Sequence, residues 1–207
     1  MGFIINLNIT WKYIPWKIKN IFIHLCFNNK RMKKIIAFAG SNSKQSINKE
    51  LVKYATSLLE KINVEILDLN DFELPIYGID HEHEHGIPEN AHKFLEYIKQ
   101  SDGIILSLAE HNGAYTTAFK NLFDWMSRIE SKTFFSKPML LMGTSPGGRG
   151  GASVLEIAQK RFPYHDANII EVFSLPFFSN NFKDEKIIDE DFNVQLKNSI
   201  QQFQNNL

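Results

Sequence analysis

The stretch that decides the fold is KIIAFAGSNSKQSINKEL, residues 34–51. Lys34 is followed by five apolar residues, which predicts a β-strand over Lys34–Ala39. Small and polar residues then occupy positions 40–46, and a helical pattern begins at Ile47. A strand that is apolar on both faces and leads through a short loop into a helix is typical of a parallel sheet covered by helices.

The same alternation continues to the end of the chain. We predict four further strands, at Val64–Leu69, Gly103–Leu108, Pro138–Gly143 and Asn168–Val172. We predict helices at Ile47–Lys61, Glu89–Gln100, Thr116–Arg128, Gly151–Arg161 and Asp189–Gln204. This pattern indicates an α/β fold, a flavodoxin-like doubly wound five-stranded parallel sheet of order 2-1-3-4-5 with helices on both faces. Ligands of such sheets bind at the carboxyl ends of the strands.

The first segment at that edge, residues 40–48, is neither a P-loop nor a Gly-x-Gly-x-x-Gly turn. It places hydroxyl groups around a predicted helix N-terminus, whose free N–H groups suit a phosphate. Ser41, Ser43 and Ser46 can donate hydrogen bonds to phosphate oxygens. Ser46 has the alternative role of a helix cap. Asn48 can either donate an amide hydrogen bond or brace the loop.

Two more segments follow the third and fourth predicted strands. Residues 109–115 are AEHNGAY, and residues 143–151 are GTSPGGRGG, with four glycines within five positions. Glycine lets the backbone approach a flat ligand closely. A phosphate loop beside two such segments predicts a site for a mononucleotide with a planar heteroaromatic ring.

Three motifs carry a specific resemblance: GSNSKQSINKEL at 40–51, AEHNGAYTTAFKNLFDWMSR at 109–128 and GTSPGGRGG at 143–151. In order and spacing they resemble the NADPH-dependent FMN reductase family over about residues 33–172. The resemblance implies that the FMN phosphate is bound by Ser41, Ser43, Ser46 and Asn48. It places along one edge of the isoalloxazine ring Ala109, Glu110, His111, Asn112 and Gly113, and at the other side Ser145, Gly147 and Gly148.

The chain departs from the family pattern at three of these positions. Ala109 stands where the family has a proline. His111 stands where the family has a tyrosine, which replaces a phenol ring near the flavin with an imidazole. Ser43 stands where relatives often have an arginine, so hydroxyl and main-chain groups, helped by Lys44, are expected to bind the phosphate.

The resemblance implies an NAD(P)H-dependent reductase that passes hydride through bound FMN, with NADPH or NADH as donor, to a quinone, a flavin or a similar small acceptor. Such chemistry needs no catalytic side chain. His111 is the candidate for donating a proton to the acceptor. The alternatives are a flavodoxin-type electron carrier and an FMN-dependent binding or regulatory module. The resemblance also implies a homodimer or homotetramer.

Composition narrows the partners and the compartment. Residues 1–31 hold five basic residues and no acidic one, whereas the whole chain has 23 of each. Zero net charge argues against nucleic-acid binding, and no apolar run is long enough for a membrane span. The single cysteine, Cys26, fits a reducing compartment, so we expect a cytoplasmic protein. We expect 32–207 to be the FMN-binding domain and 1–31 a non-native upstream extension or a surface-binding segment.

Three remaining segments have simpler interpretations. His81-Glu82-His83-Glu84-His85 offers metal ligands, but it lies between Pro75 and Pro88, and we expect a mobile solvent-facing loop and no metal. In the helix predicted over 116–128, the apolar stripe expected to pack in the core consists of Ala118, Phe119, Leu122, Trp125 and Met126. Candidates for a subunit contact are Phe123, Trp125 and Met126. We expect residues 177–191 to be a surface loop.

Overall fold

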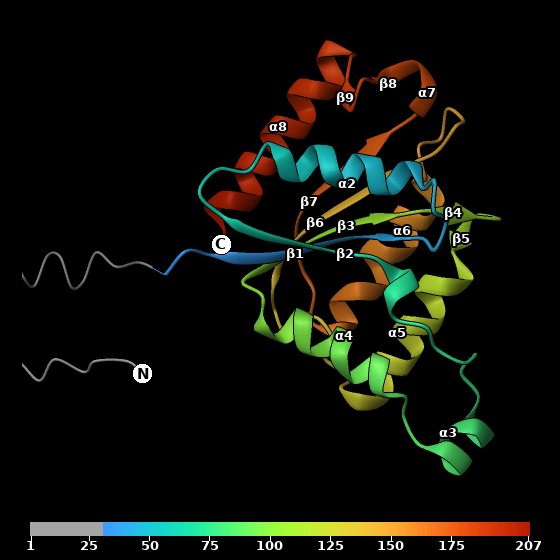
Figure 1. The fold of residues 1–207 in the computed structure, drawn as a ribbon. Coiled ribbons are helices and arrows are strands. Elements are labelled where there is room, and N and C mark those ends of the chain that lie inside the picture. Colours follow the sequence, from blue (N-terminus) through green and yellow to red (C-terminus); the bar gives the residue numbers. More distant parts are fainter. Residues whose placement is uncertain (1–30) are drawn as a thin grey trace, which may run out of the picture. The chain divides into compact units, whose positions relative to one another are not determined.

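Five parallel strands form the centre of the structure, a computed structural model that describes residues 31–207 (Figure 1). The strands are β1 (Lys34–Gly40), β2 (Asn63–Leu67), β3 (Gly103–Leu108), β6 (Pro138–Thr144) and β7 (Asn168–Leu175). Their spatial order is β2-β1-β3-β6-β7, and every neighbouring pair is parallel. The predicted order 2-1-3-4-5 is therefore confirmed.

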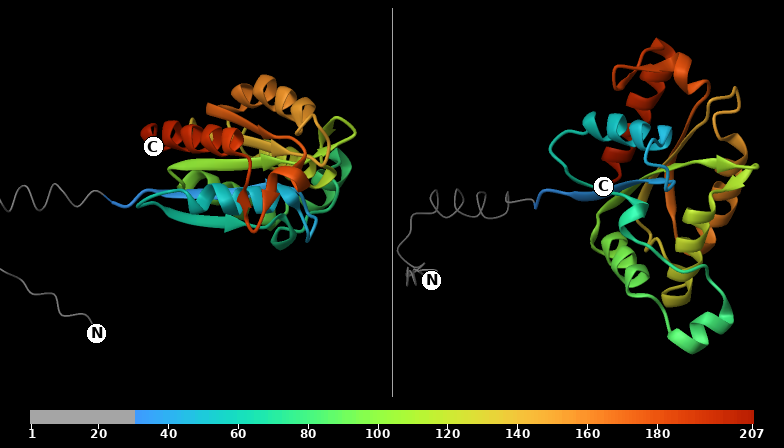
Figure 2. Two further views of the ribbon diagram at one scale, coloured as in Figure 1. Left: turned by 90° about the horizontal axis from the view of Figure 1, so that it is seen from above. Right: turned by 45° about the vertical axis from the view of Figure 1, so that its right-hand side comes forward.

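Helices cover both faces of this sheet, as Figure 2 shows. One face carries α2 (Ile47–Ser57) and α8 (Glu190–Asn205), and the other carries α4 (Glu89–Gln100), α5 (Thr117–Ile129) and α6 (Ala152–Arg161). Successive side chains of a strand point to opposite faces. In β1, Ile35 therefore packs in the core under α2 and α8, whereas Ile36 packs in the core under α4, α5 and α6. Both faces of the sheet are apolar because both are buried.

The ends of several elements differ from the predicted bounds. Helix α2 ends at Ser57 rather than at Lys61, and Lys61 itself has a left-handed backbone with φ of 56°. Strand β7 extends to Leu175, because its residues continue to pair with β6. Short additional elements are η2 (Leu69–Asp71), η3 (Phe162–His165) and the hairpin of β4 (Glu110–His111) with β5 (Ala114–Tyr115).

The predicted surface loop over 177–191 contains regular structure. It holds α7 (Phe178–Asn181) and the hairpin of β8 (Phe182–Lys183) with β9 (Lys186–Ile187). Phe178 and Ile187 are buried against the α2 and α8 side of the core. The expectation of a plain loop was wrong because these apolar side chains find partners far away in the sequence.

The His-Glu alternation at 81–85 is also not a loop. It forms the short helix α3 (Ile79–His85), which projects from the body of the protein in Figure 1. Gly86, with φ of 75°, ends this helix, and its N–H bonds to the carbonyl oxygen of Glu82 at 2.8 Å. Among residues 31–207, no cluster of His, Cys, Asp or Glu is arranged to hold a metal ion.

Helix α3 is held against α5 by polar and aromatic contacts. The guanidinium of Arg128 donates two hydrogen bonds to the carboxylate of Glu82, at 2.8 and 3.2 Å. Trp125 donates from its indole nitrogen to the carbonyl of Pro75 at 2.8 Å, and the ring of His81 lies edge-on to its ring. A helix of this length is unstable alone, so these contacts to α5 explain its formation.

Phe123, Trp125 and Met126 are buried within the chain, with exposed fractions of 4%, 0% and 1%. The core interpretation of the α5 stripe is therefore confirmed. These side chains are covered by the chain itself and are not presented to a second subunit.

Residues 33–207 form one compact unit. The predictions for residues 1–30, including the basic and aromatic extension, concern residues outside the described part of the chain. No helix in the described part is both long and apolar enough to cross a bilayer.

Replacing Arg128 by alanine should release α3 from α5 without unfolding the sheet. We expect amide hydrogen exchange over residues 79–86 to accelerate severalfold, because opening of α3 is a local event, while the midpoint of thermal unfolding changes little. Lys120→Ala is the matched control, since Lys120 pairs with Asp124 on the same helix. Unchanged exchange over 79–86 in Arg128→Ala would show that the Glu82 pair does not hold α3.

Candidate functional site

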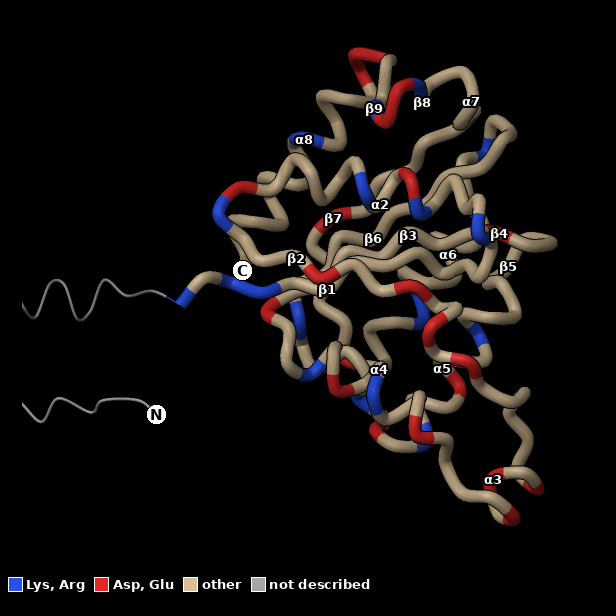
Figure 3. Tube along the Cα trace, viewed as in Figure 1, with Lys and Arg blue, Asp and Glu red and all other residues tan. Residues whose placement is uncertain are grey.

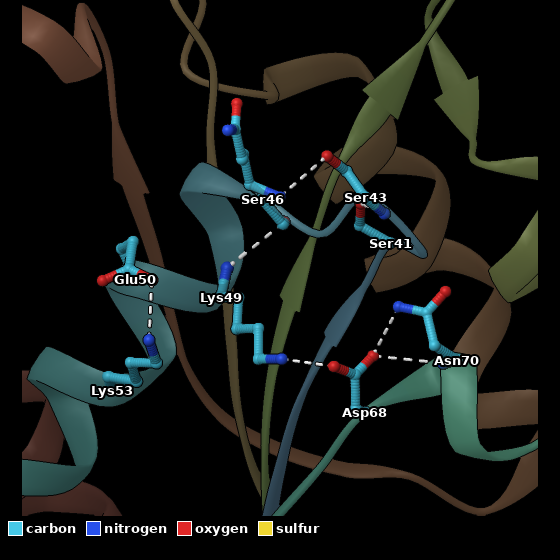
Figure 4. A network of polar contacts seen from close by, with 9 residues as sticks. Ser41, Ser43, Ser46, Lys49, Glu50, Lys53, Asp68 and Asn70 are labelled. Carbon is cyan, nitrogen blue, oxygen red and sulfur yellow. Dashed lines mark hydrogen bonds and ion pairs between the residues drawn. The ribbon is translucent and has the colours of Figure 1, made fainter.

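The loop between β1 and α2 is organised by its own serines (Figure 4). The hydroxyl oxygen of Ser41 accepts the N–H of Ser43 at 3.2 Å, and that of Ser43 accepts the N–H of Gln45 at 3.3 Å. Ser46 caps α2 by accepting the N–H of Lys49 at 3.3 Å. Within residues 31–207, none of these three hydroxyls uses its own hydrogen in a bond. Each is therefore held in place as an acceptor and keeps a donor for a ligand.

An ion pair fixes this end of α2 to the end of β2. Lys49 bonds to the carboxylate of Asp68, which also accepts the main-chain and side-chain N–H groups of Asn70 at 3.1 and 2.8 Å (Figure 4). Burial opposes ionisation of Asp68, but the hydrogen bonds from Lys49 and Asn70 outweigh it and keep its pKa below the ordinary value. The carboxylate is thus charged near neutral pH, and Lys49 is engaged with it rather than directed at the serine loop.

Asn48 braces the loop between β1 and α2, which was one of the two roles considered for it from sequence. Its side chain is 2% exposed. The amide oxygen accepts the hydroxyl of Ser107 at 2.7 Å and the N–H of Thr144 at 3.1 Å, and the amide nitrogen donates to the carbonyl of Thr144 at 3.3 Å. Asn48 therefore ties the start of α2 to the ends of β3 and β6.

Two buried threonines, Thr116 and Thr144, add further hydrogen bonds at the carboxyl edge of the sheet. Thr116 caps α5 and donates its hydroxyl to the carbonyl of Gly40 at 2.8 Å. Thr144 donates its hydroxyl to the carbonyl of Leu175 at 2.7 Å. With Asn48, these contacts connect the ends of β1, β3, β6 and β7.

The segment after β3 is a tight hairpin rather than a plain loop. Asn112 and Gly113 both have positive φ, 51° and 77°, which is the geometry of a two-residue hairpin turn, and Asn-Gly is the sequence signal for it. Glu110 accepts the main-chain N–H of Val154 in α6 at 3.1 Å. Its carboxylate therefore positions the hairpin, and a ligand at this hairpin meets mainly the backbone and His111.

Tyr115 anchors the base of the hairpin. Its ring lies parallel to that of Phe162 at 6.0 Å, and its buried hydroxyl has no partner among the described residues. Burial raises the pKa of Tyr115 to about 12, so the phenol is not an acid at physiological pH.

The glycines after β6 differ in how much room their surroundings leave for a side chain. A side chain at Gly150 would collide with Ser174, whose hydroxyl donates to the Gly150 carbonyl at 3.0 Å. A side chain at Gly148 would meet the ring of Phe177, with 2.7 Å between the two nearest carbon atoms. Only open space surrounds the corresponding position of Gly147. A side chain at Gly150 is thus excluded by the protein itself, one at Gly148 would require the Phe177 ring to move, and Gly147 has the most room for a ligand.

A cavity of about 440 Å³ opens beside these loops. Asn42 of the serine loop and His111 of the hairpin both line it, together with Asn70, Glu73 and the first turns of α5. Leu69, Phe72 and Leu122 add apolar surface. The segment 69–74 was not among the predicted site residues, and its apolar and polar mixture gave no motif by which to find it.

The predicted site residues thus lie along one edge of the sheet but not in one cavity. Hydrogen bonds of Asn48 and Glu110 join the three loops. Of the predicted site residues, His111 alone lines the cavity, which lies on the α5 side of the serine loop.

Removing the Asn48 amide should weaken the whole edge. In Asn48→Ala, the hydroxyl of Ser107 and both main-chain groups of Thr144 lose a buried partner, so we expect the free energy of unfolding to fall by about 2–4 kcal/mol. Chemical denaturation measures this loss. Asn42→Ala is the control, because Asn42 is exposed, and should change stability by less than about 0.5 kcal/mol. Equal stability of both variants would contradict the bracing role.

Known proteins resemble this chain in sequence and in fold. The family model described as NADPH-dependent FMN reductase matches residues 33–180. The chain is 30% identical over 122 residues to a quinone reductase of Escherichia coli K12, covering 57% of this chain and 63% of that protein. It is 31% identical over 121 residues to a 2-hydroxy-1,4-benzoquinone reductase of Burkholderia sp., covering 58% and 64% respectively.

Among solved structures, FerB, a flavoenzyme NAD(P)H:(acceptor) oxidoreductase from Paracoccus denitrificans, has a TM-score of 0.66 and 24% identity, covering 83% of this chain and 94% of that one. This likeness concerns the fold. The aligned part of the chain spans a little under two thirds of the two curated relatives. The family match covers all three loops that the Asn48 network and Glu110 hold together, and the chain therefore belongs to the NADPH-dependent FMN reductase family.

Proposed function

We propose that this protein is an FMN-containing oxidoreductase that uses NADPH or NADH to reduce a quinone, a flavin or a similar small acceptor. The observation that carries the proposal is the serine loop, where three hydroxyls are fixed as acceptors and keep their donors for a ligand. Family membership supports FMN as that ligand. The quinone reductases among the similar proteins support a small acceptor.

The residues present fit FMN. Ser41, Ser43 and Ser46 would donate to the phosphate, and the N-terminus of α2 adds its dipole. Lys44 is exposed in the same loop and adds positive charge beside it. Asn48 holds the loop, since its amide oxygen accepts two bonds and its amide nitrogen donates to Thr144, and one of its two amide hydrogens is left for the phosphate.

The ring would lie along the hairpin and the glycine loop. Ala109, Asn112 and Gly113 offer backbone groups on one side, and Ser145, Gly147 and Gly148 offer them on the other. Bound FMN supplies the chemistry of hydride transfer between a nicotinamide and an acceptor. The protein's own part is to bind and orient these molecules and to position His111, which we propose donates a hydrogen bond or proton to the acceptor carbonyl.

The cavity beside His111 would hold the acceptor. Its lining includes the carboxylate of Glu73 and no lysine or arginine from the described part of the chain. Such a lining disfavours anionic molecules, because an unpaired negative charge beside a carboxylate is repelled. Neutral quinones suit the mixed polar and apolar surface.

Two alternatives make different predictions. Figure 3 shows acidic and basic residues mixed along α4 and α5, whereas an electron carrier usually presents an acidic docking surface. A carrier or an FMN-dependent regulatory module would not sustain NADPH oxidation by itself. Steady-state oxidation of NADPH with a quinone, by the purified protein alone, separates them from a reductase.

We further propose a homodimer or homotetramer in the cytoplasm. Ile76 and Ile79, on the segment that projects with α3, are 78% and 47% exposed. Apolar side chains on a projecting segment are suited to a subunit contact. The single cysteine supports a reducing compartment.

The function is tested by the visible spectrum. We expect the purified protein to bind FMN in a 1:1 ratio and the bound yellow chromophore to bleach on anaerobic addition of NADPH or NADH. A protein that stays colourless in excess FMN would contradict the proposal.

Ser43→Ala should weaken FMN binding about tenfold, because one hydrogen bond to a charged phosphate contributes about 1.5 kcal/mol. Quenching of FMN fluorescence on titration into the apoprotein measures the dissociation constant. Ser57→Ala, an exposed serine at the far end of α2, is the control and should bind FMN as the wild type does. Equal affinities of Ser43→Ala and the wild type would remove Ser43 from the phosphate site.

His111→Phe should lower kcat/KM for quinones, measured per bound FMN, about tenfold through loss of a hydrogen bond to the acceptor. His92→Phe, an exposed histidine on α4, is the matched control. If His111→Phe turns over every acceptor at the wild-type rate, His111 has no role in the reaction.

A further inference from the structure

Phe177 has an unusual conformation next to the glycine loop. Its φ is 48° and ψ is 54°, in the left-handed region that bulky residues rarely adopt. Such a conformation is strained and persists only where surrounding contacts hold it. The side chain is 51% exposed, so burial in the core does not explain it.

Contacts with the glycine loop do explain it. The N–H of Phe177 donates to the carbonyl of Gly147 at 3.0 Å, and the N–H of Phe178 donates to the carbonyl of Ser145 at 3.1 Å. The Phe178 ring stacks on that of Phe182, with 4.6 Å between centroids, and secures this segment. The Phe177 ring lies against Gly148, where it occupies the space of a side chain.

These contacts set the orientation of the peptide between Gly147 and Gly148. The Gly147 carbonyl accepts from Phe177, from the hydroxyl of Ser145 at 3.1 Å and from the N–H of Gly150 at 3.4 Å. The carbonyl and N–H of a trans peptide point in opposite directions, and the described chain contains no cis peptide. The N–H of Gly148 is therefore directed away from this group of donors, and within residues 31–207 no hydrogen bond uses it.

We propose that Phe177 is a positioning residue that presents the Gly148 N–H to the flavin ring. Its main chain holds the Gly147 carbonyl, and its ring packs against Gly148 and prevents the peptide from turning. This inference rests on the proposed function, because Gly147 and Gly148 are there assigned to the flavin. Phe177 itself does not need to touch the flavin for this role.

The proposal explains why position 148 is a glycine. A methyl group there would lie 2.7 Å from the Phe177 ring, whereas one at Gly147 would meet nothing within 4 Å. No positive φ is required at either position. Alanine at 148 is therefore unfavourable only while the ring of Phe177 is present.

A double-mutant cycle tests the contact. Unfolding of the wild type, Phe177→Gly, Gly148→Ala and the double variant is measured by chemical denaturation. Glycine at 177 keeps the left-handed backbone and its N–H while removing the ring. We expect Gly148→Ala to be more destabilising in the wild type than in the Phe177→Gly background, with Gly147→Ala neutral in both.

FMN binding tests the positioning role. We expect Phe177→Gly to weaken FMN binding about tenfold, the equivalent of one misaligned hydrogen bond, and to shift the visible spectrum of the bound flavin. Phe177→Leu, which restores an apolar side chain against Gly148, should recover most of both. Phe177→Gly with wild-type affinity and spectrum would overturn the inference, as would additive effects in the cycle. A wild type that binds no FMN would instead contradict the proposed function itself and the inference that rests on it.

Discussion

The site depends on one buried amide. Asn48 lies at the start of α2, and its side chain meets Ser107 at the end of β3 and both main-chain groups of Thr144 at the end of β6. Unpaired polar groups at this depth are costly, so all of these partners must be in place together. A single side chain thereby fixes the relative positions of the loops that follow β1, β3 and β6.

In the loops held by this amide, several polar side chains stabilise the loop itself and are not left free to bind a ligand. Polar side chains such as Glu110 and Ser145 are used to build the loops, through bonds to Val154 and Gly147. The groups left for a ligand are mostly hydroxyl hydrogens and main-chain N–H groups. A flavin, with a phosphate at one end and hydrogen-bonding ring atoms at the other, is suited to such a surface, and the redox chemistry itself needs no charged side chain.

Much of the fold could be predicted because its strands are short apolar runs that need no distant contact to be recognised. The strand order and the position of the serine loop follow from that pattern. The role of Asn48 could not be decided from sequence, because its partners Ser107 and Thr144 are 59 and 96 residues away. Helix α3 could not be predicted for the same reason, because it is stabilised by contacts with Trp125 and Arg128 of α5. Residues 69–74 likewise line the cavity without any sequence motif that marks them. The Asn112-Gly113 dipeptide, by contrast, is a sequence signal for a hairpin turn. The contact between Gly148 and the Phe177 ring is visible only in the structure.

The central claim is that the three loops act as one FMN site. An NMR titration of the isotope-labelled protein with FMN, following the backbone amide signals, tests it most directly. The account predicts that signals of residues 41–46, 109–113 and 145–148 shift together with a single dissociation constant and saturate at one FMN per chain. Shifts confined to one loop, or no shifts in excess FMN, would contradict it.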